Sequence, residues 1–395
     1  MAQHTPLTDS DAIIVAYGRS PIGRAGKGSL ENVRPDDLAA HVTDKVLQKV
    51  PQLDRTTIDD VICGCGLPAG EQGFNLGRVV SIVARLDVPG TTVNRYCSSS
   101  LQTSRMAYHA IKAGEGDAFV SVGAECVSRY AHGYADPPDA QNPRLLPGNV
   151  EEYPDVYIAM GQTAENVADR EGITREEMDR YAVKSQNLAV RARDDGFFDR
   201  EIIPVPLPDG STLQRDDGPR PNTTMEVLAT LKPAFRENGR VTAGNACPLN
   251  DGAAAIVILS NRKAKALGVQ PLARIVASAV TSLEPEVMGL GPIEASRRAL
   301  ARAHMNMDDI DILEINEAFA AQVIPCARAL GVDPLSDKLN PHGGAIALGH
   351  PFGMTGARVL CTLLNGLRSA DKTIGLETMC VGGGQGMAMI VERLG

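Results

Sequence analysis

A cysteine stands where the sequence predicts that a strand gives way to a helix, and a histidine stands before a proline in a glycine-rich loop. Cys97 lies in NRYCSSSLQT (94–103), and His350 lies in the glycine-rich stretch GGAIALGHPFGMTGAR (343–358). A helix N-terminus stabilises a thiolate, and an imidazole can take the thiol proton, so the pair predicts a nucleophile and its general base. The alternative for each is a packing role, since free cysteines are commonly buried and a lone histidine is commonly structural.

Two further polar groups follow predicted strands. Asn316 and Glu317 end the strand in INEAFA (315–320), where parallel sheets carry ligand groups; the pair also fits a helix start with Asn316 as its cap and Glu317 in its first turn. Cys380 precedes GGGQG and a short apolar strand, which favours a tight loop presenting backbone N–H groups over a nucleotide-phosphate loop. Cys380 is therefore a second candidate thiol, with packing as its alternative.

The composition limits the classes of function. The chain of 395 residues is 43% apolar and 22% charged, which is typical of a globular protein with two or three domains. Its net charge is −9, it has no tryptophan, and aromatic residues make up only 4%, so neither the basic face nor the stacking platform of a nucleic-acid-binding protein is expected.

The eight cysteines are expected to be reduced thiols. The N-terminal sequence has no export pattern, and no apolar run approaches the roughly 20 residues that span a bilayer, so we expect a cytoplasmic protein without disulfides or a membrane span. Metal binding is not expected either, because CGC at 63–65 lacks zinc-type spacing and no second cysteine pair or nearby histidine completes a site.

Strands and helices alternate in two regions, which predicts a mostly parallel sheet covered by helices. The predicted strands are 12–18, 58–66, 91–96, 117–125, 252–260, 271–282 and 310–320, and the predicted helices include 34–50, 98–116 and 292–304. Between the two regions, turn-rich stretches (135–155 and 204–224) flank a helical segment (163–196), in which Thr174 and Glu177 fit a capping box. We expect this part to be an insertion that carries binding loops.

The two alternating regions resemble each other. The stretch 58–70 parallels 307–320, and 94–125 parallels 348–379, which aligns Cys97 with His350. If the halves pack about a pseudo-twofold axis, equivalent loops meet at the centre, and Cys97 lies opposite His350.

Six stretches, in this order along the chain, resemble the signature regions of the thiolase family. They are RSPIGRAGKGSL (19–30), NRYCSSSLQ (94–102), VTAGNACPLNDGAAA (241–255), NEAFA (316–320), GGAIALGHPFGMTGAR (343–358) and CVGGGQG (380–386). The resemblance implies an α/β fold of two pseudo-symmetric halves, layered α-β-α-β-α, with an inserted loop domain. The implied boundaries are 1–125 plus 251–274 for the first half, 126–250 for the loop domain and 275–395 for the second half.

The resemblance also implies roles for the residues singled out above. Cys97 would accept the acyl group, and His350 would activate the Cys97 thiol. Cys380 would be the acid and base that transfers the proton of the α-carbon. Asn316 would hold a water that, with His350, stabilises the enolate oxygen. The backbone N–H groups of Cys97 and Gly382 would form a second oxyanion hole.

Contacts to coenzyme A (CoA) and substrate follow from the same resemblance, as do four departures from it. The implied contacts are Arg220, Cys247, Met160, Met288 and Phe319. The departures are Ser100 for a usual glycine, Cys247-Pro248 for Ser-Gly, Ala159 where short-chain biosynthetic members carry histidine, and the less usual Gln162. Ser100 predicts a crowded helix start, and Cys247 puts one contact to the pantetheine arm in doubt.

The resemblance implies a CoA-dependent acyltransferase that cleaves 3-ketoacyl-CoA to acetyl-CoA and a shortened acyl-CoA, by a reversible Claisen reaction. CoA and acyl-CoA are then substrates, no cofactor is permanently bound, and a homodimer or homotetramer is expected. A role in fatty acid β-oxidation fits better than synthesis of acetoacetyl-CoA, because the histidine is absent at Ala159. The alternatives are an acetoacetyl-CoA-specific acetyltransferase, a decarboxylating condensing enzyme on the same scaffold, and a non-catalytic binding protein. Cys380 and the Asn316-Glu317 motif oppose the condensing enzyme, and the presence of Cys97, His350 and Cys380 opposes the binding protein.

Overall fold

The strands of the main sheet follow an order that mirrors itself. The computed structural model describes residues 6–130, 137–146 and 153–395. Its strands are β1 (Ala12–Arg19), β2 (Gly23–Arg24), β3 (Asp60–Gly64), β4 (Gly90–Val93), β5 (Ala118–Cys126), β6 (Val205–Pro206), β7 (Thr212–Leu213), β8 (Asn250–Ser260), β9 (Ala273–Ser282), β10 (Ile312–Ile315), β11 (Ile374–Val381) and β12 (Gln385–Arg393). The main sheet has the order β10-β11-β12-β9-β1-β8-β5-β3-β4, with β2 beside β8, whereas β6 and β7 pair separately.

The mirrored order reflects the internal repeat. Reading outward from the middle, β1, β8, β5 and β3 on one side correspond to β9, β12, β11 and β10 on the other. The halves join where β1 pairs with β9, through Ile13 opposite Arg274 and Ile14 opposite Ala273. The repeated stretches 58–70 and 307–320 contain the corresponding strands β3 and β10. The predicted pair of similar α/β halves is confirmed.

The prediction of a mostly parallel sheet is wrong. The pairs β3–β4, β3–β5 and β10–β11 are parallel, but β1–β8, β1–β9, β5–β8, β9–β12 and β11–β12 are antiparallel. In each half the last strand, β8 or β12, does not follow a crossover helix. β8 comes after the long insertion and β12 follows a tight hairpin, so both can run against their neighbours.

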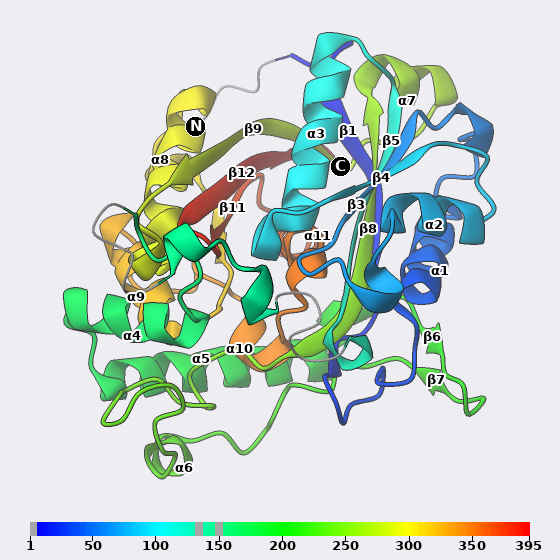
Figure 1. Ribbon diagram of the computed structural model, residues 1–395. Helices are drawn as coiled ribbons and strands as arrows, with labels where there is room; N and C mark the ends of the chain where they lie inside the picture. The colour runs from blue at the N-terminus through cyan, green and yellow to red at the C-terminus, as the bar shows by residue number, and fades with distance from the viewer. Residues whose placement is uncertain (1–5, 131–136, 147–152) are drawn as a thin grey trace.

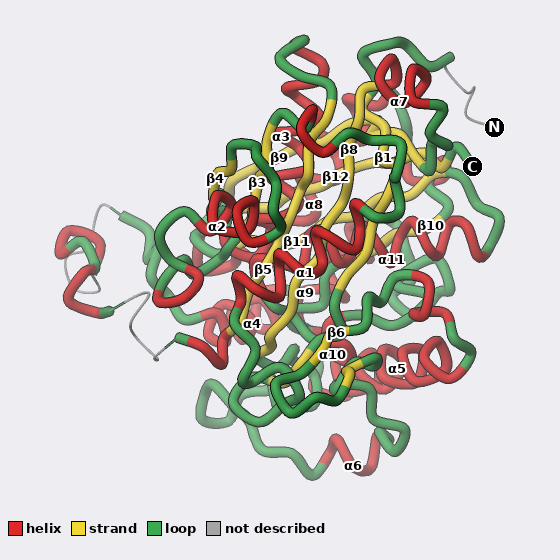
Figure 2. The backbone as a smooth tube through the Cα atoms, turned by 90° about the vertical axis from the view of Figure 1, so that its right-hand side faces the viewer, coloured by secondary structure: helices red, strands yellow, loops and turns green. Residues whose placement is uncertain are grey.

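Helices fill the spaces on both faces of each half (Figures 1 and 2). α1 and α2 cover the outer face of the first half, α8 and α9 cover that of the second, and α3 and α11 lie between the two halves. This gives the predicted α-β-α-β-α layering. The helices are α1 (Pro35–Leu47), α2 (Leu76–Val83), α3 (Ser99–Ala113), α4 (Met160–Arg170), α5 (Arg175–Asp194), α6 (Met225–Ala229), α7 (Asn261–Leu267), α8 (Gly291–Ala303), α9 (Ala320–Ala329), α10 (Ala345–Leu348) and α11 (Phe352–Ser369).

Strand alternation divides the apolar side chains among these layers. In β8, Val257 and Leu259 face the core under α1, while Ile256 and Ile258 face the central core with α3 and α11. β8 is therefore apolar at successive positions and buried along its whole length, as expected of a strand covered on both faces.

The two central helices approach each other closely near their N-termini. A Cβ atom on Gly356 of α11 would lie 2.3 Å from the backbone nitrogen of Leu101 in α3, so only glycine fits there. Ser100, one residue earlier, accepts a hydrogen bond from the backbone N–H of Ala357 at 2.8 Å. Its side chain fits because Gly123 lies opposite, where a Cβ atom would come within 2.5 Å of Ser100 Cβ. The predicted crowding at Ser100 is thus relieved, and the serine links α3 to α11.

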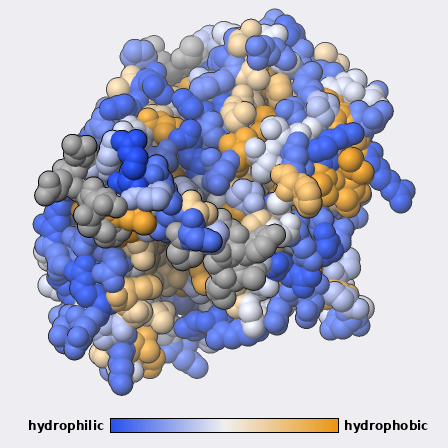
Figure 3. Space-filling model, in the orientation of Figure 1, coloured by the Kyte–Doolittle hydropathy of each residue, from blue (hydrophilic) through white to orange (hydrophobic). Residues whose placement is uncertain are grey.

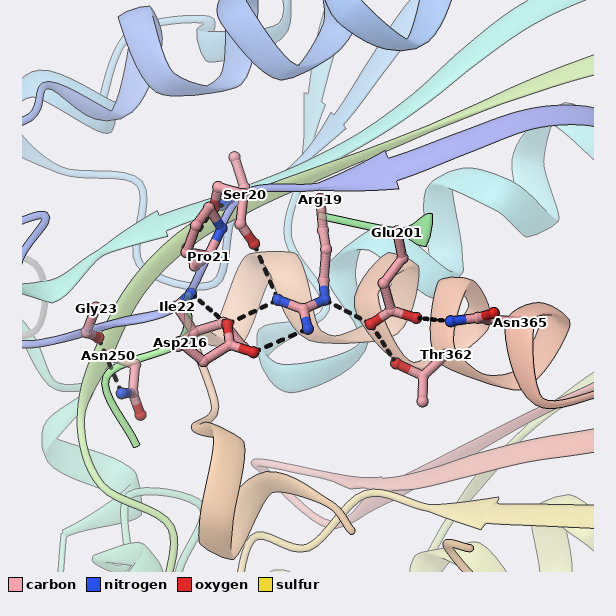
Figure 4. A network of polar contacts seen from close by, with 11 residues as sticks. Arg19, Ser20, Pro21, Ile22, Gly23, Glu201, Asp216, Asn250, Thr362 and Asn365 are labelled. Carbon is pink, nitrogen blue, oxygen red and sulfur yellow. Dashed lines mark hydrogen bonds and ion pairs between the residues drawn. The ribbon is translucent and has the colours of Figure 1, made fainter. Parts of the chain in front are cut away.

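The insertion between β5 and β8 is bonded to both the sheet and the central layer (Figure 4). Arg19, at the end of β1, donates from Nε to Glu201 at 2.7 Å and makes two bonds to Asp216, at 2.7 and 3.0 Å. Glu201 also accepts bonds from Thr362 (3.1 Å) and Asn365 (3.2 Å) of α11. These fully buried partners satisfy a guanidinium that would otherwise be costly to bury.

Other predictions for the insertion are settled in part. The capping box of Thr174 and Glu177 begins α5, as predicted. Parts of the predicted loop stretch 135–155, namely 135–136 and 147–152, lie outside the described residues. All eight cysteines are free thiols. None of the helices in the described ranges is long and apolar enough to cross a membrane.

Candidate active site

Cys97 lies in a 3₁₀ turn, η3 (Tyr96–Ser98), directly before α3. Its side chain is buried, with the residue 8% exposed. Burial raises the pKa of the Cys97 thiol to about 11, although the backbone N–H groups of Gly382 and of Cys97 itself lower it by bonding to the sulfur. The pKa of Cys97 is thus set by two opposing effects: burial disfavours the thiolate, and the backbone N–H groups at the sulfur favour it.

Two other thiols interact with Cys97. Cys380 is the second-last residue of β11. Its pKa is raised well above the usual value, first by burial and then by a charge on Cys97. Cys247 lies in the loop before β8. Its pKa is also raised, first by burial and then by a charge on Cys97. The backbone N–H of Cys247 donates to Ala318 at 3.0 Å, which holds this loop against the NEAFA stretch. Cys97, Cys247 and Cys380 are therefore close enough for a charge on one thiol to act on the others.

The backbone of His350 is fixed by a residue that the sequence analysis did not single out. The N–H of His350 donates to Asn250 Oδ1 at 2.9 Å, and Asn250 Nδ2 donates to Gly23 O at 2.9 Å. Gly349 has φ of 115°, and a Cβ there would lie 2.6 Å from Asn250 Cγ. Asn250 thus ties the first half of the molecule to the histidine of the second.

The ring of His350 is held in one tautomer. Its Nδ1 lies 2.6 Å from Thr355 Oγ1, and that hydroxyl donates its own proton to Pro351 O at 2.8 Å. Nδ1 must therefore carry the ring proton, which leaves Nε2 free to accept one. Burial, and then the positive charge of Arg358, lower the pKa of His350 to about 3, so the ring is neutral at rest.

Asn316 faces the free ring nitrogen. Its Nδ2 lies 3.4 Å from His350 Nε2, its backbone N–H donates to Thr378 O at 3.0 Å, and its buried Oδ1 has no hydrogen-bond partner among the described residues. The helix-cap alternative is wrong, because the chain stays non-helical to Phe319 and α9 begins only at Ala320. Asn316 is thus free to present its amide to the site.

Glu317 is a buried organising residue and is not in the first turn of a helix. Its carboxylate accepts bonds from Tyr181 (2.8 Å) and Ser185 (2.6 Å) of α5, from Asn340 (2.9 Å) and from the backbone N–H of Ile346 (3.1 Å). These bonds join the insertion to the loop before His350.

Glu125 has the corresponding role on the other side of the site. At the end of β5 it accepts from the N–H groups of Gly66 (2.7 Å), Leu67 (3.2 Å) and Gly353 (2.8 Å). It therefore ties the loop after β3 to the start of α11. Burial raises the pKa of Glu125, while these N–H groups lower it.

These anchors bring the two helix starts together. The turn that holds Cys97 packs against both β11, which ends near Cys380, and the N-terminal part of α11, which follows His350. Phe352 marks the meeting point: its ring lies edge-on to His350 at 5.2 Å, and its Cβ would lie 2.9 Å from a Cβ on Gly66. The predicted approach of the loops that hold Cys97 and His350 is confirmed.

An apolar wall lies beside this point. Met160 begins α4, and its sulfur would lie 3.8 Å from a Cβ on Gly382. Phe319 packs edge-on against Phe235 at 5.9 Å, and Phe235 is still 42% exposed. Met288 is buried beneath the wall in the turn η8 (Pro285–Leu290). Phe235 was not singled out from the sequence, because its exposure, which marks an aromatic residue as a candidate for binding, is known only from the structure.

Arg220 lies apart from the thiols on the surface of the insertion. Its backbone N–H donates to Gln186 at 2.9 Å, and burial together with the charge of Arg24 lowers the pKa of its guanidinium. The described residues contain no group of three or more His, Cys, Asp or Glu side chains that could hold a metal ion.

The arrangement can perform acyl transfer on a thiol. It combines a buried sulfur, two backbone N–H groups directed at it, a neutral imidazole with a free Nε2, an amide beside that nitrogen and a second thiol. A nucleophile, a base and donors for a developing negative charge are the elements of covalent catalysis.

Comparison with known proteins agrees with this chemistry. The family models "Thiolase, N-terminal domain" and "Thiolase, C-terminal domain" match residues 12–262 and 269–393. The chain is 42% identical to a 3-ketoacyl-CoA thiolase of Bacillus subtilis (97% of this chain, 99% of the relative). It is 44% identical to a 3-oxoadipyl-CoA/3-oxo-5,6-dehydrosuberyl-CoA thiolase of Escherichia coli (97% and 100%).

Solved structures show the same likeness over the whole fold. The dimeric peroxisomal thiolase of Saccharomyces cerevisiae matches with a TM-score of 0.92 and 36% identity (98% of this chain, 99% of that chain). The acetyl-CoA acetyltransferase of Bacillus anthracis matches with a TM-score of 0.89 and 39% identity (97% and 99%). The chain belongs to the thiolase family.

Proposed function

We propose that this thiolase, an acyltransferase, cleaves 3-ketoacyl-CoA with a second molecule of CoA to give acetyl-CoA and a shortened acyl-CoA. The observation that carries the proposal is the packing of the turn that holds Cys97 against both β11, near Cys380, and the start of α11, after His350, whose Nε2 lies 3.4 Å from Asn316 Nδ2. CoA thioesters are substrates in this reaction, and no permanently bound cofactor takes part.

The first half-reaction needs the Cys97 proton to move as substrate binds. His350 Nε2 is the acceptor that Thr355 leaves free. The sulfur then attacks the keto carbon, and the two N–H groups stabilise the oxyanion. The bond between the α- and β-carbons breaks, the acyl group stays on Cys97, and the acetyl-CoA enolate takes a proton from Cys380.

The second half-reaction transfers the acyl group to CoA. The CoA thiol gives its proton to the Cys380 thiolate that the first half-reaction left, and the CoA sulfur attacks the thioester carbonyl. Cys97 then leaves as a thiolate and takes its proton back from His350. During the first step Asn316 and His350 face the enolate oxygen, and the unpartnered Asn316 Oδ1 suits the bridging water that the family resemblance implies.

Substrate contacts are proposed on the apolar wall. Met160, Phe319 and Met288, with Cys247 beside them, would line the path of the pantetheine arm and acyl chain, and Arg220 would meet the nucleotide end of CoA. Phe235 joins this set because its exposed ring packs on Phe319. Relatives named for 3-ketoacyl-CoA and for the carboxylated 3-oxoadipyl-CoA leave both chain types as substrates to test.

We further propose that the protein forms a homodimer through the free edge of β4. That edge strand pairs only with β3 among the described residues. Beside it lie the exposed apolar side chains of Phe74 (99%), Ile82 (57%) and Val83 (43%), and Figure 3 shows apolar surface over α2. The yeast relative is described as dimeric. A tetramer, a cytoplasmic location, a role in β-oxidation and the three domain boundaries stay predictions.

Peptide mapping after incubation with acetyl-CoA tests the reaction. We expect one acetyl group on the peptide that holds Cys97 and none on the peptides of Cys247 or Cys380, because only Cys97 receives two N–H donors at its sulfur. Rates of thiolysis across acetoacetyl-CoA, longer 3-ketoacyl-CoAs and 3-oxoadipyl-CoA then define the substrate. Turnover of malonyl thioesters with inert acetoacetyl-CoA would instead indicate a decarboxylating condensing enzyme.

A further inference from the structure

A cationic cavity lies on the side of the molecule away from the thiols, where β1 meets the end of the chain. It has a volume of about 250 Å³. Its floor is apolar, from Val15, Ala16, Leu272 and Leu364. Its rim carries four basic side chains and no acidic one: Lys49, Arg200, Arg368 and Arg393.

Three of the four cations on the rim have no carboxylate partner within salt-bridge distance among the described residues. Lys49 Nζ donates to the backbone oxygen of Tyr17 at 2.8 Å, and Arg200 Nη1 donates to the Ser369 hydroxyl at 2.6 Å. Arg368 stands in the last turn of α11, where a positive charge also complements the helix dipole. Only Arg393 is paired, with Asp371 at 2.6 Å.

The nearest buried carboxylate is already used. The charge of Glu201 reaches Tyr17 and Lys49 of the cavity, but its oxygens accept bonds from Arg19, Thr362 and Asn365 (Figure 4). The positive charges of Arg368 and Arg200 reach the phenol of Tyr17, whose pKa they lower against the larger effect of burial. Like charges gathered around one cavity repel each other unless an anion neutralises them, and the whole chain has a net charge of −9.

A second cavity of about 290 Å³ adjoins the first and shares Arg200 with it. It adds Arg191 and the stacked rings of Phe197 and His342, whose centroids are 3.6 Å apart. Its one acidic lining residue is Asp195. The pair of cavities can therefore hold a charged group in the first and an attached organic group in the second.

We propose that the first cavity binds a multiply charged phosphate group, held by Lys49, Arg200 and Arg368. Guanidinium groups bind phosphate oxygens in pairs, and three unpaired cations match an anion of two or more charges better than a single carboxylate. The group comes either from inorganic pyrophosphate or from a nucleoside diphosphate that extends into the second cavity. This site is separate from the thiols and independent of the proposed reaction.

Isothermal titration of the full chain with sodium pyrophosphate tests the site. We expect saturable binding of one pyrophosphate per chain, weakened about tenfold or more by Arg200→Gln and by Arg368→Gln. Both residues are exposed, so the variants should fold, which circular dichroism checks. The matched control is the double variant Arg297→Gln/Arg298→Gln on the exposed face of α8, which should bind as the unaltered protein does.

A parallel titration with ADP separates the two sources. Tighter binding of ADP than of pyrophosphate, lost in Arg200→Gln, identifies a nucleotide site, while equal affinities identify a site for the phosphate group alone. The absence of saturable pyrophosphate binding up to about 10 mM, or binding that the arginine variants leave unchanged, overturns the proposal. The rate of thiolysis should be the same in both arginine variants.

Discussion

Cys97 and His350 precede the central helices at corresponding places in the two halves, yet they are held by different means. The sulfur of Cys97 receives backbone N–H groups, from Gly382 and from Cys97 itself. The ring of His350 is fixed by side chains, with Thr355 on Nδ1 and Asn316 beside Nε2. The repeat therefore supplies two equivalent positions, and the local donors decide that one becomes a nucleophile and the other a base.

The strongest test of this difference removes the sulfur. Cys97→Ala should lower kcat/KM for 3-ketoacyl-CoA thiolysis about 10⁴-fold or more, because no other group can carry the acyl intermediate. A steady-state assay of CoA-dependent cleavage measures it. Cys361→Ala is the matched control: that thiol is also buried, in the central core on α11, and its loss should change stability and not the rate. Activity within tenfold of the parent in Cys97→Ala would refute the assignment.

Removing the base should have the next largest effect. His350→Asn keeps the backbone bond to Asn250 but offers no nitrogen at the Nε2 position, so kcat should fall about 10²- to 10⁴-fold. The same assay measures kcat and KM separately. An unchanged kcat would assign His350 to packing, which was the alternative from the sequence.

The protonation state at rest can be measured by alkylation. Burial raises the pKa of Cys97 to about 11, so the neutral thiol dominates at pH 8 and the reactive thiolate grows as the pH rises. Labelling of the Cys97 peptide by iodoacetamide should therefore accelerate about tenfold for each pH unit from 8 to 10. A rate that is already constant below pH 8 would mean that the thiolate exists at rest.

The tautomer of His350 predicts a smaller effect. Thr355→Val removes the oxygen that accepts the Nδ1 proton, so a larger share of the rings carries the proton on Nε2 and cannot act as a base. We expect kcat to fall roughly tenfold with little change in KM. Thr355→Ser, which keeps the hydroxyl, should restore the rate; equal losses in both variants would contradict the tautomer argument.

The contact between the two helices predicts the smallest effect on catalysis. Ser100→Ala leaves the N–H of Ala357 without its side-chain acceptor and should lower the free energy of unfolding by about 1–2 kcal/mol, with kcat changed less than about twofold. Urea denaturation measures it. Ser296→Ala is the control, because the buried Ser296 hydroxyl has no hydrogen-bond partner in the described structure, and its loss should cost little or nothing.

The sequence predicts the two halves well because the repeat can be recognised from patterns of neighbouring residues. Strands recur with helices between them, and the alignment of Cys97 with His350 needs only spacing. The direction of β8 and β12 could not be predicted in this way, because it depends on what the connections before them allow. The chain after Asn316 shows the same limit. An Asn-Glu pair suits a helix cap, but Glu317 is held by bonds from α5 and from the loop at 340–346, and the helix begins only at Ala320.

Residues that position the site were harder to find than residues that react. Asn250 lies within one of the signature stretches, but its bond to His350 spans 100 positions. Glu125 meets Gly353 across 228 positions. No local pattern predicts such pairs. A reactive residue is easier to find, because few residue types carry a thiol or an imidazole.

The pairing of β1 has a consequence for the order in which the chain can fold. β1 forms ladders only with β8 and β9 among the described strands, so its partners lie more than 200 residues further along the chain. At about 5–20 residues per second of synthesis, β1 waits roughly ten to fifty seconds before the first strand of its two ladders is made. Until then both edges of this eight-residue strand lack their ladder partners. The first half of the molecule is thus completed late, and conditions that slow elongation should increase aggregation of the nascent protein.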